Sequence, residues 1–412
     1  MKIPTRLVLA ALLSAGLSAA PVRAAEPLRV ALIAPLSGPD AAGGRAEFAQ
    51  ARFVAAEVNA AGGMAGGRQI EVVAYDTRSV PEETSLQLRR AIGDGVRFYL
   101  HGGESGRLAE LAALMERHNA TTPNNRLMML DYSAEALPAN RRCNPWRFRF
   151  DASPESKIRA LGASILASRP SSSVYLLGEN TAFGNSLSLA LIRYLGPRGA
   201  NLAIAGNALY DPGTGPGATP QLEKVVDSGA GVLILASRGS EILSLLADRR
   251  VLDLRIPIYT FYGALAGATK AIGLKGVDVI RVVHVAPMNP SISPAWADFR
   301  RRFKSGYADL DFSHPMLLTA IRMFAAASRK SGSTDAEPIA RSLAGMRFTT
   351  RWSDEVYMRP QDQQLITPVR VSVQANQAIE FDIDNSGFGL RTEATVPADR
   401  ASTDPICSIA KQ

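Results

Sequence analysis

The side chains of this sequence that could do covalent chemistry are scattered along the chain. None of the four histidines, His101, His118, His284 and His314, has the HxxxH or CxxC…H spacing of a metal site. Residues 102–107 (GGESGR) include Ser105, but Arg107 stands where a nucleophile elbow needs a second glycine. Ser105 is better interpreted as a helix N-cap. We therefore expect no catalysis, no cofactor and no bound metal.

Two further stretches share only composition with nucleotide or polyanion sites. Residues 213–217 (GTGPG) are rich in glycine, but prolines follow and no Lys-Ser/Thr pair closes a phosphate loop. Four basic residues, Arg300, Arg301, Arg302 and Lys304, lie together without interleaved aromatic residues. We interpret them as a solvated helix face and expect no nucleic-acid partner.

Small and hydroxyl-bearing residues follow three of the predicted strands. These junctions are residues 101–105, 131–134 and 236–241. In open α/β sheets, ligands bind beyond the carboxyl ends of the strands, where helix N-termini offer free N–H donors and partial positive charge. The junctions could therefore hold a carboxylate, although an ordinary N-cap or turn is the alternative interpretation of each. The pattern favours binding over catalysis.

The elements that must position these junctions alternate between short β-rich runs and amphipathic helices. Strands are predicted at 28–34, 70–75, 96–100, 127–130, 173–177, 201–205, 231–235, 257–261 and 282–286. Helices are predicted at 48–60, 82–92, 105–117, 155–168, 185–195, 221–226, 241–249, 294–307, 315–331 and 337–344. Residues 364–373 and 378–381 are predicted to form antiparallel strands. The alternation predicts an α/β protein with two doubly wound parallel-sheet lobes.

The amino terminus has the pattern of a secretory signal peptide. Lys2 and Arg6 precede an apolar run at 7–20, which is too short to span a membrane, and we expect cleavage after Ala24. An amino-terminal membrane anchor is the alternative. The formal charge of the 412-residue chain is +8, and removing residues 1–24 leaves 43 Lys+Arg against 38 Asp+Glu, or +5. Because no cysteine precedes Cys143, the leader is not predicted to be lipidated.

The chain has two cysteines, Cys143 and Cys407, which is five residues from the carboxyl end. In an exported protein two cysteines are expected to pair, and this bridge would tie the tail to the body of the molecule. Two free buried thiols are the alternative.

Several stretches carry a resemblance to a known family. They include 33–39 (IAPLSGP), 47–48 (EF), 59–67 (NAAGGMAGG) and 73–76 (VAYD), and further segments at 127–130, 147–149, 182–184, 257–263 and 312–332. These resemble periplasmic solute-binding proteins of the leucine/isoleucine/valine type, which serve ABC importers. The resemblance implies the type I fold, with two lobes joined by three crossovers that close on a ligand. It implies a first lobe of 25–149 plus 285–352 and a second lobe of 150–284 plus 353–412.

The resemblance also implies which first-lobe residues contact ligand. In the family a serine of the loop matching residues 101–106 binds the amino-acid carboxylate, and here that loop offers Ser105 and Gly103. A second loop matches residues 131–135 and contains Tyr132 and Ser133. An aromatic residue that commonly lies over the ligand falls at Gly43.

In the second lobe the sequence departs from the family pattern. A second aromatic residue falls at Phe183, but the family's acidic partner for the ligand ammonium aligns at Tyr262. Arg238 occupies a loop where another aromatic residue is common. These changes favour an acid or an amide over a standard amino acid.

We therefore expect a monomeric periplasmic solute-binding subunit of an ABC importer. Its ligand would be a branched-chain or hydrophobic amino acid, or a related carboxylate or amide, and its partner a cognate permease in the inner membrane. A sensory module that delivers its closed form to a membrane receptor is the alternative function. An exported hydrolase that uses Ser105 is a weaker one.

Overall fold

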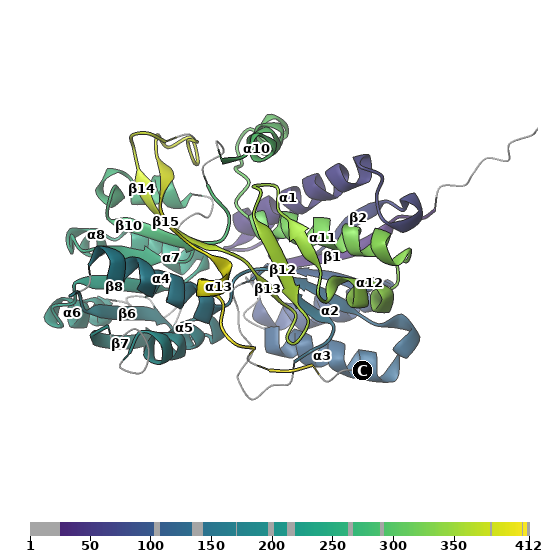
Figure 1. The fold of residues 1–412 in the computed structure, drawn as a ribbon, viewed down its shortest axis with the longest axis horizontal. Coiled ribbons are helices and arrows are strands. Elements are labelled where there is room, and N and C mark those ends of the chain that lie inside the picture. Colours follow the sequence, from purple (N-terminus) through teal and green to yellow (C-terminus); the bar gives the residue numbers. More distant parts are fainter. Residues whose placement is uncertain are drawn as a thin grey trace, which may run out of the picture.

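The computed structural model describes residues 25–102, 108–133, 143–169, 171–196, 202–211, 219–262, 267–288, 292–379, 381–405 and 407–409. These residues form two α/β lobes that lie side by side (Figure 1). Within these ranges, the helices are all too short or too polar to cross a membrane.

The first lobe is built on an eight-stranded sheet with the order β11-β12-β13-β5-β4-β3-β1-β2. Its strands are β1 Leu28–Ala34, β2 Ile70–Asp76, β3 Phe98–His101, β4 Met128–Asp131, β5 Arg147–Arg149, β11 Arg347–Thr349, β12 Glu355–Arg359 and β13 Gln364–Ile366. The six neighbouring strands β2, β1, β3, β4, β5 and β13 pair in parallel. At the edge of the sheet, β12 pairs antiparallel with both β13 and β11.

The second lobe is built on a seven-stranded sheet with the order β15-β14-β10-β9-β8-β6-β7. Its strands are β6 Val174–Glu179, β7 Ile204–Tyr210, β8 Val232–Ala236, β9 Ile258–Thr260, β10 Ile280–His284, β14 Val369–Ala375 and β15 Gly389–Val396. β14 pairs antiparallel with both β10 and β15, and the strands from β10 across to β7 pair in parallel. Both lobes therefore have the predominantly parallel sheets that the sequence predicted.

Helices cover both faces of each sheet. The helices are α1 Ala41–Ala60, α2 Pro81–Gly93, α3 Leu108–Thr121, α4 Pro154–Ser168, α5 Ala182–Tyr194, α6 Thr219–Asp227, α7 Gly239–Ala247, α8 Arg249–Asp253, α9 Ala268–Ile272, α10 Pro294–Gly306, α11 Pro315–Ser331, α12 Ala336–Leu343 and α13 Ala398–Ala401, with 3-10 turns η1 Ala65–Gly67, η2 Pro123–Asn125 and η3 Leu274–Gly276. Alternate residues of β1 point to opposite faces, since Leu32 packs with α1 and α11 while Ala31 packs with α2 and α3.

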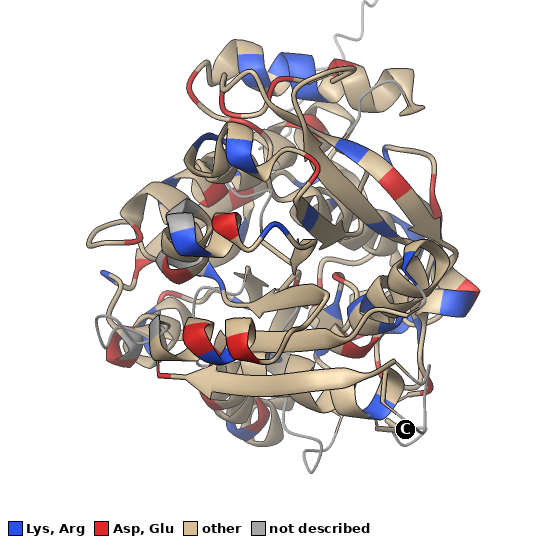
Figure 2. Ribbon diagram, turned by 90° about the vertical axis from the view of Figure 1, so that its left-hand side faces the viewer, with Lys and Arg blue, Asp and Glu red and all other residues tan. Residues whose placement is uncertain are grey.

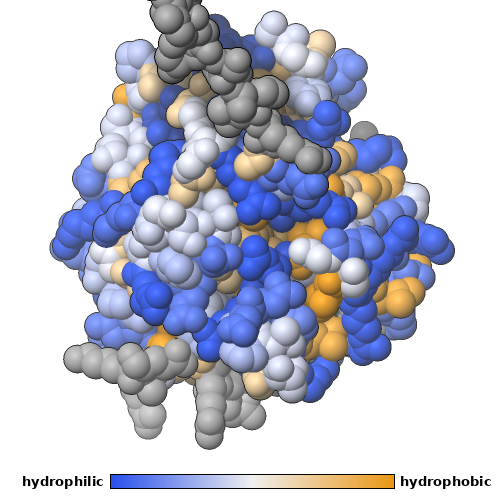
Figure 3. Space-filling model, turned by 90° about the vertical axis from the view of Figure 1, so that its right-hand side faces the viewer, coloured by the Kyte–Doolittle hydropathy of each residue, from blue (hydrophilic) through white to orange (hydrophobic). Residues whose placement is uncertain are grey.

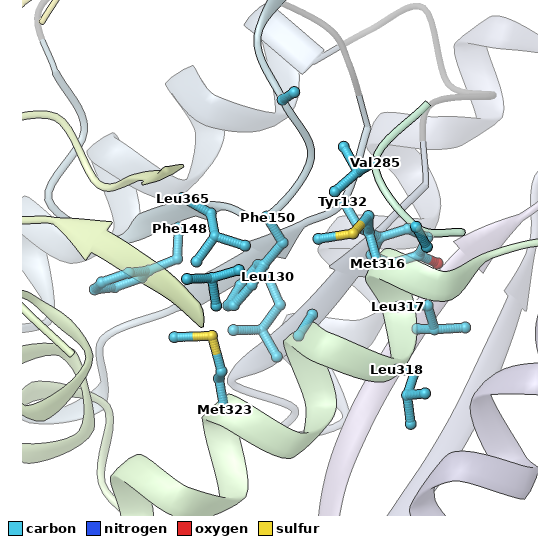
Figure 4. Close-up of a cluster of buried hydrophobic side chains, with 14 of the residues drawn as sticks. Leu130, Tyr132, Phe148, Phe150, Val285, Met316, Leu317, Leu318, Met323 and Leu365 are labelled. Atoms are coloured by element: carbon cyan, nitrogen blue, oxygen red, sulfur yellow. The ribbon is translucent and has the colours of Figure 1, made fainter. Parts of the chain in front are cut away.

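One hydrophobic core continues from the first lobe into the second. It includes Leu130 of β4, Phe148 of β5 and Phe150, which lies in the connection that leads to α4. Figure 4 shows these side chains packed against Met323 of α11 and Leu365 of β13. The connections between the lobes are therefore anchored in packed apolar surface and are not loose linkers.

The chain passes between the two sheets three times before its carboxyl-terminal tail. The passages lie between β5 and α4, between β10 and α10, and between β13 and β14. The third differs from the expected crossing near residue 353. Because β12 and β13 pair within the first sheet, the chain enters the second sheet only between Ile366 and Val369.

Other differences from the predicted elements have local causes. The predicted strand at 364–373 is two strands, interrupted at Pro368, which has no N–H to donate to a sheet. No strand forms at residues 378, 379 and 381, and β15 pairs with β14 instead. The helix predicted at 48–60 begins at Ala41, because Gly44 lets α1 approach the carbonyl of Pro35 so closely that a Cβ would overlap it.

The prediction that the basic residues of α10 form a solvated face is wrong for Arg300. Its side chain is only 2% exposed, and its guanidinium lies over the ring of Phe381. Arg301 and Arg302 are the exposed members and pair with Asp298. In the view of Figure 2, blue and red residues are interspersed, with no basic stripe on this face. Figure 3 shows mostly hydrophilic residues, with separate hydrophobic patches, on the opposite face.

The two cysteines are paired. Cys143 and Cys407 form a disulfide with a Cα–Cα distance of 5.5 Å across 264 residues of sequence.

Candidate functional site

The strand ends of the first lobe carry a buried polar network. His101 ends β3 and is in register with Asp131, which ends β4. The Nδ1 atom of His101 lies 3.1 Å from Oδ1 of Asp131, and the Arg147 guanidinium donates to Oδ2 of Asp131 at 2.7 Å. Ser133 donates to Oδ1 of Asp131 from both its backbone N, at 2.9 Å, and its hydroxyl, at 2.6 Å.

This network keeps the Asp131 carboxylate ionised although it is fully buried. Burial by itself would raise the pKa of Asp131, but the charge of Arg147 and the hydrogen bonds from His101 and Ser133 outweigh burial and hold the pKa below its usual value. Asp131 therefore fixes the backbone and hydroxyl of Ser133, one of the predicted ligand-binding residues.

A second buried contact joins Tyr132 to helix α1. The Tyr132 hydroxyl donates to a carboxylate oxygen of Glu47, and both side chains are buried. Burial raises the pKa of Glu47, although the hydrogen bond from Tyr132 and the proximity of His101 act in the opposite direction. Figure 4 shows Tyr132 beside Met316 of α11 and Val285, which belongs to the second passage between the lobes.

Gly102 lies between Glu47 and Tyr132. A Cβ at this position would overlap the Glu47 carboxylate and would lie 2.9 Å from Cε2 of the Tyr132 ring. A larger residue here would have to displace the Glu47 carboxylate from the Tyr132 hydroxyl, so Gly102 lets the end of β3 lie close against both side chains.

Gln50 fixes the start of α11 against the same part of α1. Its Oε1 accepts from the backbone N of Ser313 at 3.0 Å and of His314 at 2.9 Å. The His314 ring lies edge-on to Tyr132, with centroids 6.3 Å apart. Burial lowers the pKa of His314 to about 4, so its imidazole is neutral at pH 7.

Polar residues also gather at two strand ends of the second lobe. Arg238 follows β8, and its backbone N donates to the carboxylate of Glu179, at the end of β6, at 2.9 Å. The hydroxyl groups of Tyr210, at the end of β7, and Ser237 lie 2.9 Å apart. Glu179, Tyr210 and Ser237 are buried.

An aromatic cluster lies beside these groups. The ring of Phe183, in the first turn of α5, packs edge-on against Tyr262 with centroids 5.2 Å apart and against Phe261 with centroids 6.0 Å apart. Phe183 is fully buried, whereas Tyr262 is partly exposed. Tyr262 is therefore the ring of this cluster that reaches the surface.

The structure separates the predicted site residues into groups. Tyr132 and Ser133 lie together in the first lobe, and Phe183 and Tyr262 lie together in the second, with Arg238 after the neighbouring strand β8. Gly43 lies on α1 with no atom within 4 Å of where a Cβ would be. Gly103 and Ser105 lie outside the described residues.

The structure adds polar residues to those that the sequence singled out as ligand contacts. His101, Asp131 and Ser237 lie in the three predicted junctions, whereas Glu47 and Gln50 on α1, Glu179 and Tyr210 at the ends of β6 and β7, and His314 before α11 lie outside them. These five residues have no local pattern that marks them as part of a site. In the part of the chain that the structure describes, no group of three or more His, Cys, Asp or Glu side chains could hold a metal ion.

Comparison with known proteins accords with this architecture. Residues 27–378 match a family model described as periplasmic binding protein. The Leu/Ile/Val-binding protein homolog 4 of Brucella melitensis is 23% identical over 413 residues, which cover 96% of this chain and 94% of that protein.

Solved structures share the fold. The leucine-, isoleucine-, valine-, threonine- and alanine-binding protein from Brucella ovis, in a closed conformation, superposes with a TM-score of 0.80 at 20% identity, covering 93% of this chain and 98% of that one. An ABC-transporter solute-binding protein from R. palustris in complex with benzoate gives a TM-score of 0.71 at 15% identity, covering 90% and 97%.

Proposed function

The chain belongs to the periplasmic binding protein family, and on this premise we propose that it is the solute-binding subunit of an ABC importer. The observation that carries the proposal is the pair of α/β lobes, joined by three passages, with polar strand ends in both lobes. Ligand contacts made by both lobes at once favour a closed form, and an importer recognises that form.

We infer that the protein works in the periplasm and has no catalytic activity. The predicted leader at residues 1–24 would direct export, and the disulfide is of the kind that persists in an oxidising compartment. The partners would be a small organic ligand and a permease in the inner membrane, and the binding protein would act as a monomer.

For the ligand we propose an organic carboxylate or amide that has no ammonium group. Tyr262 stands where the family resemblance implies an acidic partner for an ammonium, and its partly exposed ring could lie against an apolar or aromatic ligand. Arg238 would supply positive charge. The benzoate complex of the R. palustris protein is a precedent for such a ligand within this fold.

A branched-chain amino acid is the second candidate, and one observation favours it. Glu179 places a carboxylate at a strand end of the second lobe, where it could bind an ammonium in place of the residue at 262. The names of the Brucella proteins agree with this candidate.

A thermal-shift screen tests both candidates, because a ligand that binds only the folded protein raises its melting temperature. The screen should contain isoleucine, leucine, benzoate, 3-methylbutanoate and the corresponding amides. We expect benzoate or 3-methylbutanoate to raise the melting temperature and Arg238→Ala to reduce the shift. A shift with isoleucine that is lost in Glu179→Gln but kept in Arg238→Ala would favour the amino acid. If no compound has an effect, the proposed function is contradicted.

The sensory alternative makes a different prediction. A binding module that serves a receptor would be encoded beside a receptor gene, whereas an importer subunit would be encoded beside permease and ATPase genes. Uptake assays in a strain that lacks this chain decide between the two.

A further inference from the structure

The carboxyl-terminal residues form a fourth connection between the two lobes. The chain leaves the second sheet at Val396, the end of β15, and α13 packs against α4 of the second lobe. Cys407 is then joined to Cys143, which precedes β5 of the first sheet. In Figure 1 this yellow segment runs from α13 across to the first lobe. The tail therefore begins on one lobe and is covalently fixed to the other.

Hydrogen bonds show where the tail changes lobe. Arg159 of α4, in the second lobe, donates to the carbonyl of Ser402 at 2.6 Å. Arg359 of β12, in the first lobe, donates to the carbonyl of the next residue, Thr403. Further on, the backbone N of Ile409 donates to the carbonyl of Gln361 in the β12–β13 turn at 2.7 Å. Two successive carbonyls are thus held by different lobes.

Arg359, which holds the tail on the first lobe, also belongs to a buried ion-pair network at the start of the first passage. Besides Thr403, Arg359 donates to both carboxylate oxygens of Asp362 at 2.8 Å. Asp362 also accepts from Arg149, the last residue of β5 before the first passage, at 3.0 Å. The side chain of Asp362 is fully buried, and those of Arg149 and Arg359 are 8% and 14% exposed. The tail is therefore attached beside the start of the first passage between the lobes.

We propose that residues 402–405 and 407–409, which we call the tail strap, limit the movement of the lobes relative to each other. Three passages by themselves would permit the lobes to twist as well as to hinge. A fourth attachment beside the first passage, held by a disulfide, restricts that twist and narrows the range of open conformations. Given the proposed ligand-binding function, on which this step rests, the strap raises affinity because less conformational freedom is lost when the lobes close on a ligand.

A test without ligand uses the fact that the chain has only two cysteines. The folded protein is reduced and alkylated at a temperature well below its melting point, and a control is treated with the alkylating agent alone. We expect small-angle X-ray scattering to show a larger radius of gyration and a broader distance distribution for the reduced protein, while far-UV circular dichroism stays unchanged. Identical scattering from the two samples would overturn the proposal.

Two variants extend this test. Cys143→Ser/Cys407→Ser removes the bond, and a chain that ends at Ala401 removes the whole strap but keeps α13. Both are expected to scatter like the reduced protein. If they fail to fold, the reduced and alkylated wild-type protein still decides the question, because it folds before the bond is broken.

The affinity is measured with isoleucine or benzoate, whichever raises the melting temperature of the oxidised protein. We expect reduction and alkylation to weaken binding by about five-fold or more in calorimetric titration. Equal affinities of the oxidised and reduced proteins would overturn the link to ligand binding. If neither compound binds, the proposed function fails, but the scattering comparison still decides whether the strap limits lobe movement.

Discussion

Arg370 and Asp354 form a two-point ion pair that joins the lobes. Arg370 belongs to β14 of the second sheet, and Asp354 stands just before β12 of the first. The distances are 2.7 Å between Nη1 and Oδ2 and 2.7 Å between Nη2 and Oδ1. The Arg370 guanidinium also donates to the carbonyl of Val285 in the second passage, and Trp352 donates to Asp354 at 2.9 Å. The pair thus connects the second passage with the segment that leads to the third.

We expect Asp354→Asn to destabilise the protein strongly. The two side chains are only 6% and 13% exposed, so removing the carboxylate leaves the Arg370 charge buried and uncompensated. The free energy of unfolding, measured by urea denaturation, should fall by about 3 kcal/mol or more. Asp278→Asn is the matched control, because the Arg391–Asp278 pair is 49% and 67% exposed and should contribute less than about 1 kcal/mol. Equal losses in the two variants would contradict the assigned role.

Replacing Tyr132 should destabilise the protein more than replacing Glu47, because the two changes leave different groups without a hydrogen-bond partner. In Tyr132→Phe the Glu47 carboxyl loses its buried donor, whereas Glu47→Gln keeps an acceptor for the tyrosine hydroxyl. We expect the first change to lower the free energy of unfolding by about 1–3 kcal/mol and the second to cost less. The double variant Tyr132→Phe/Glu47→Leu should recover part of the loss, since it leaves no unpaired polar group. A double variant no more stable than Tyr132→Phe would contradict the contact.

His314 should make the protein less stable below neutral pH. Because burial lowers its folded-state pKa to about 4 from an ordinary value near 6.5, the unfolded chain binds a proton at pH 5 that the folded chain does not. Stability therefore falls as the pH drops through the interval between these two values. The contribution of this one group amounts to about 2 kcal/mol between pH 7 and pH 5. In His314→Gln the fall in the free energy of unfolding over this interval should be smaller by that amount, and an unchanged pH dependence would contradict the prediction.

Two adjacent glycines of α1 should respond in opposite ways to alanine. Gly43 has no neighbouring atom within 4 Å of a Cβ, so the higher helix propensity of alanine should let Gly43→Ala raise the free energy of unfolding by up to about 1 kcal/mol and with it the melting temperature. A Cβ on Gly44 would overlap the carbonyl of Pro35, so Gly44→Ala should lower the melting temperature. Changes of the same sign would show that α1 does not begin before Gly43.

The elements that the sequence predicted best have both a periodic pattern and a stop signal. β1 and α11 have the predicted bounds, and α11 begins at Pro315 and ends before Gly332, whose φ of 65° only glycine adopts easily. β12 and β15 were not predicted, because β12 has only five residues and the polar run from Arg391 to Glu393 leaves β15 without an apolar stretch. Their positions depend on pairing with distant strands.

The candidate site was predictable only in part for a similar reason. Tyr132 and Ser133 follow a recognisable strand, so their place at a sheet edge could be inferred. Gln50 and His314 are 264 residues apart in sequence and meet only because α1 packs against α11. No local pattern contains that contact.

The place of β13 in the first sheet also has a consequence for how the protein is made. β5 pairs on one side with β4, but its other neighbour, β13, comes late in the chain, after all the parallel strands of the second sheet. During folding, one edge of β5 therefore has no partner until Gln364 arrives, while the parallel strands of the second sheet are already complete. Unpaired strand edges promote aggregation, so the first lobe is expected to be the part of the molecule that depends most on chaperones during folding.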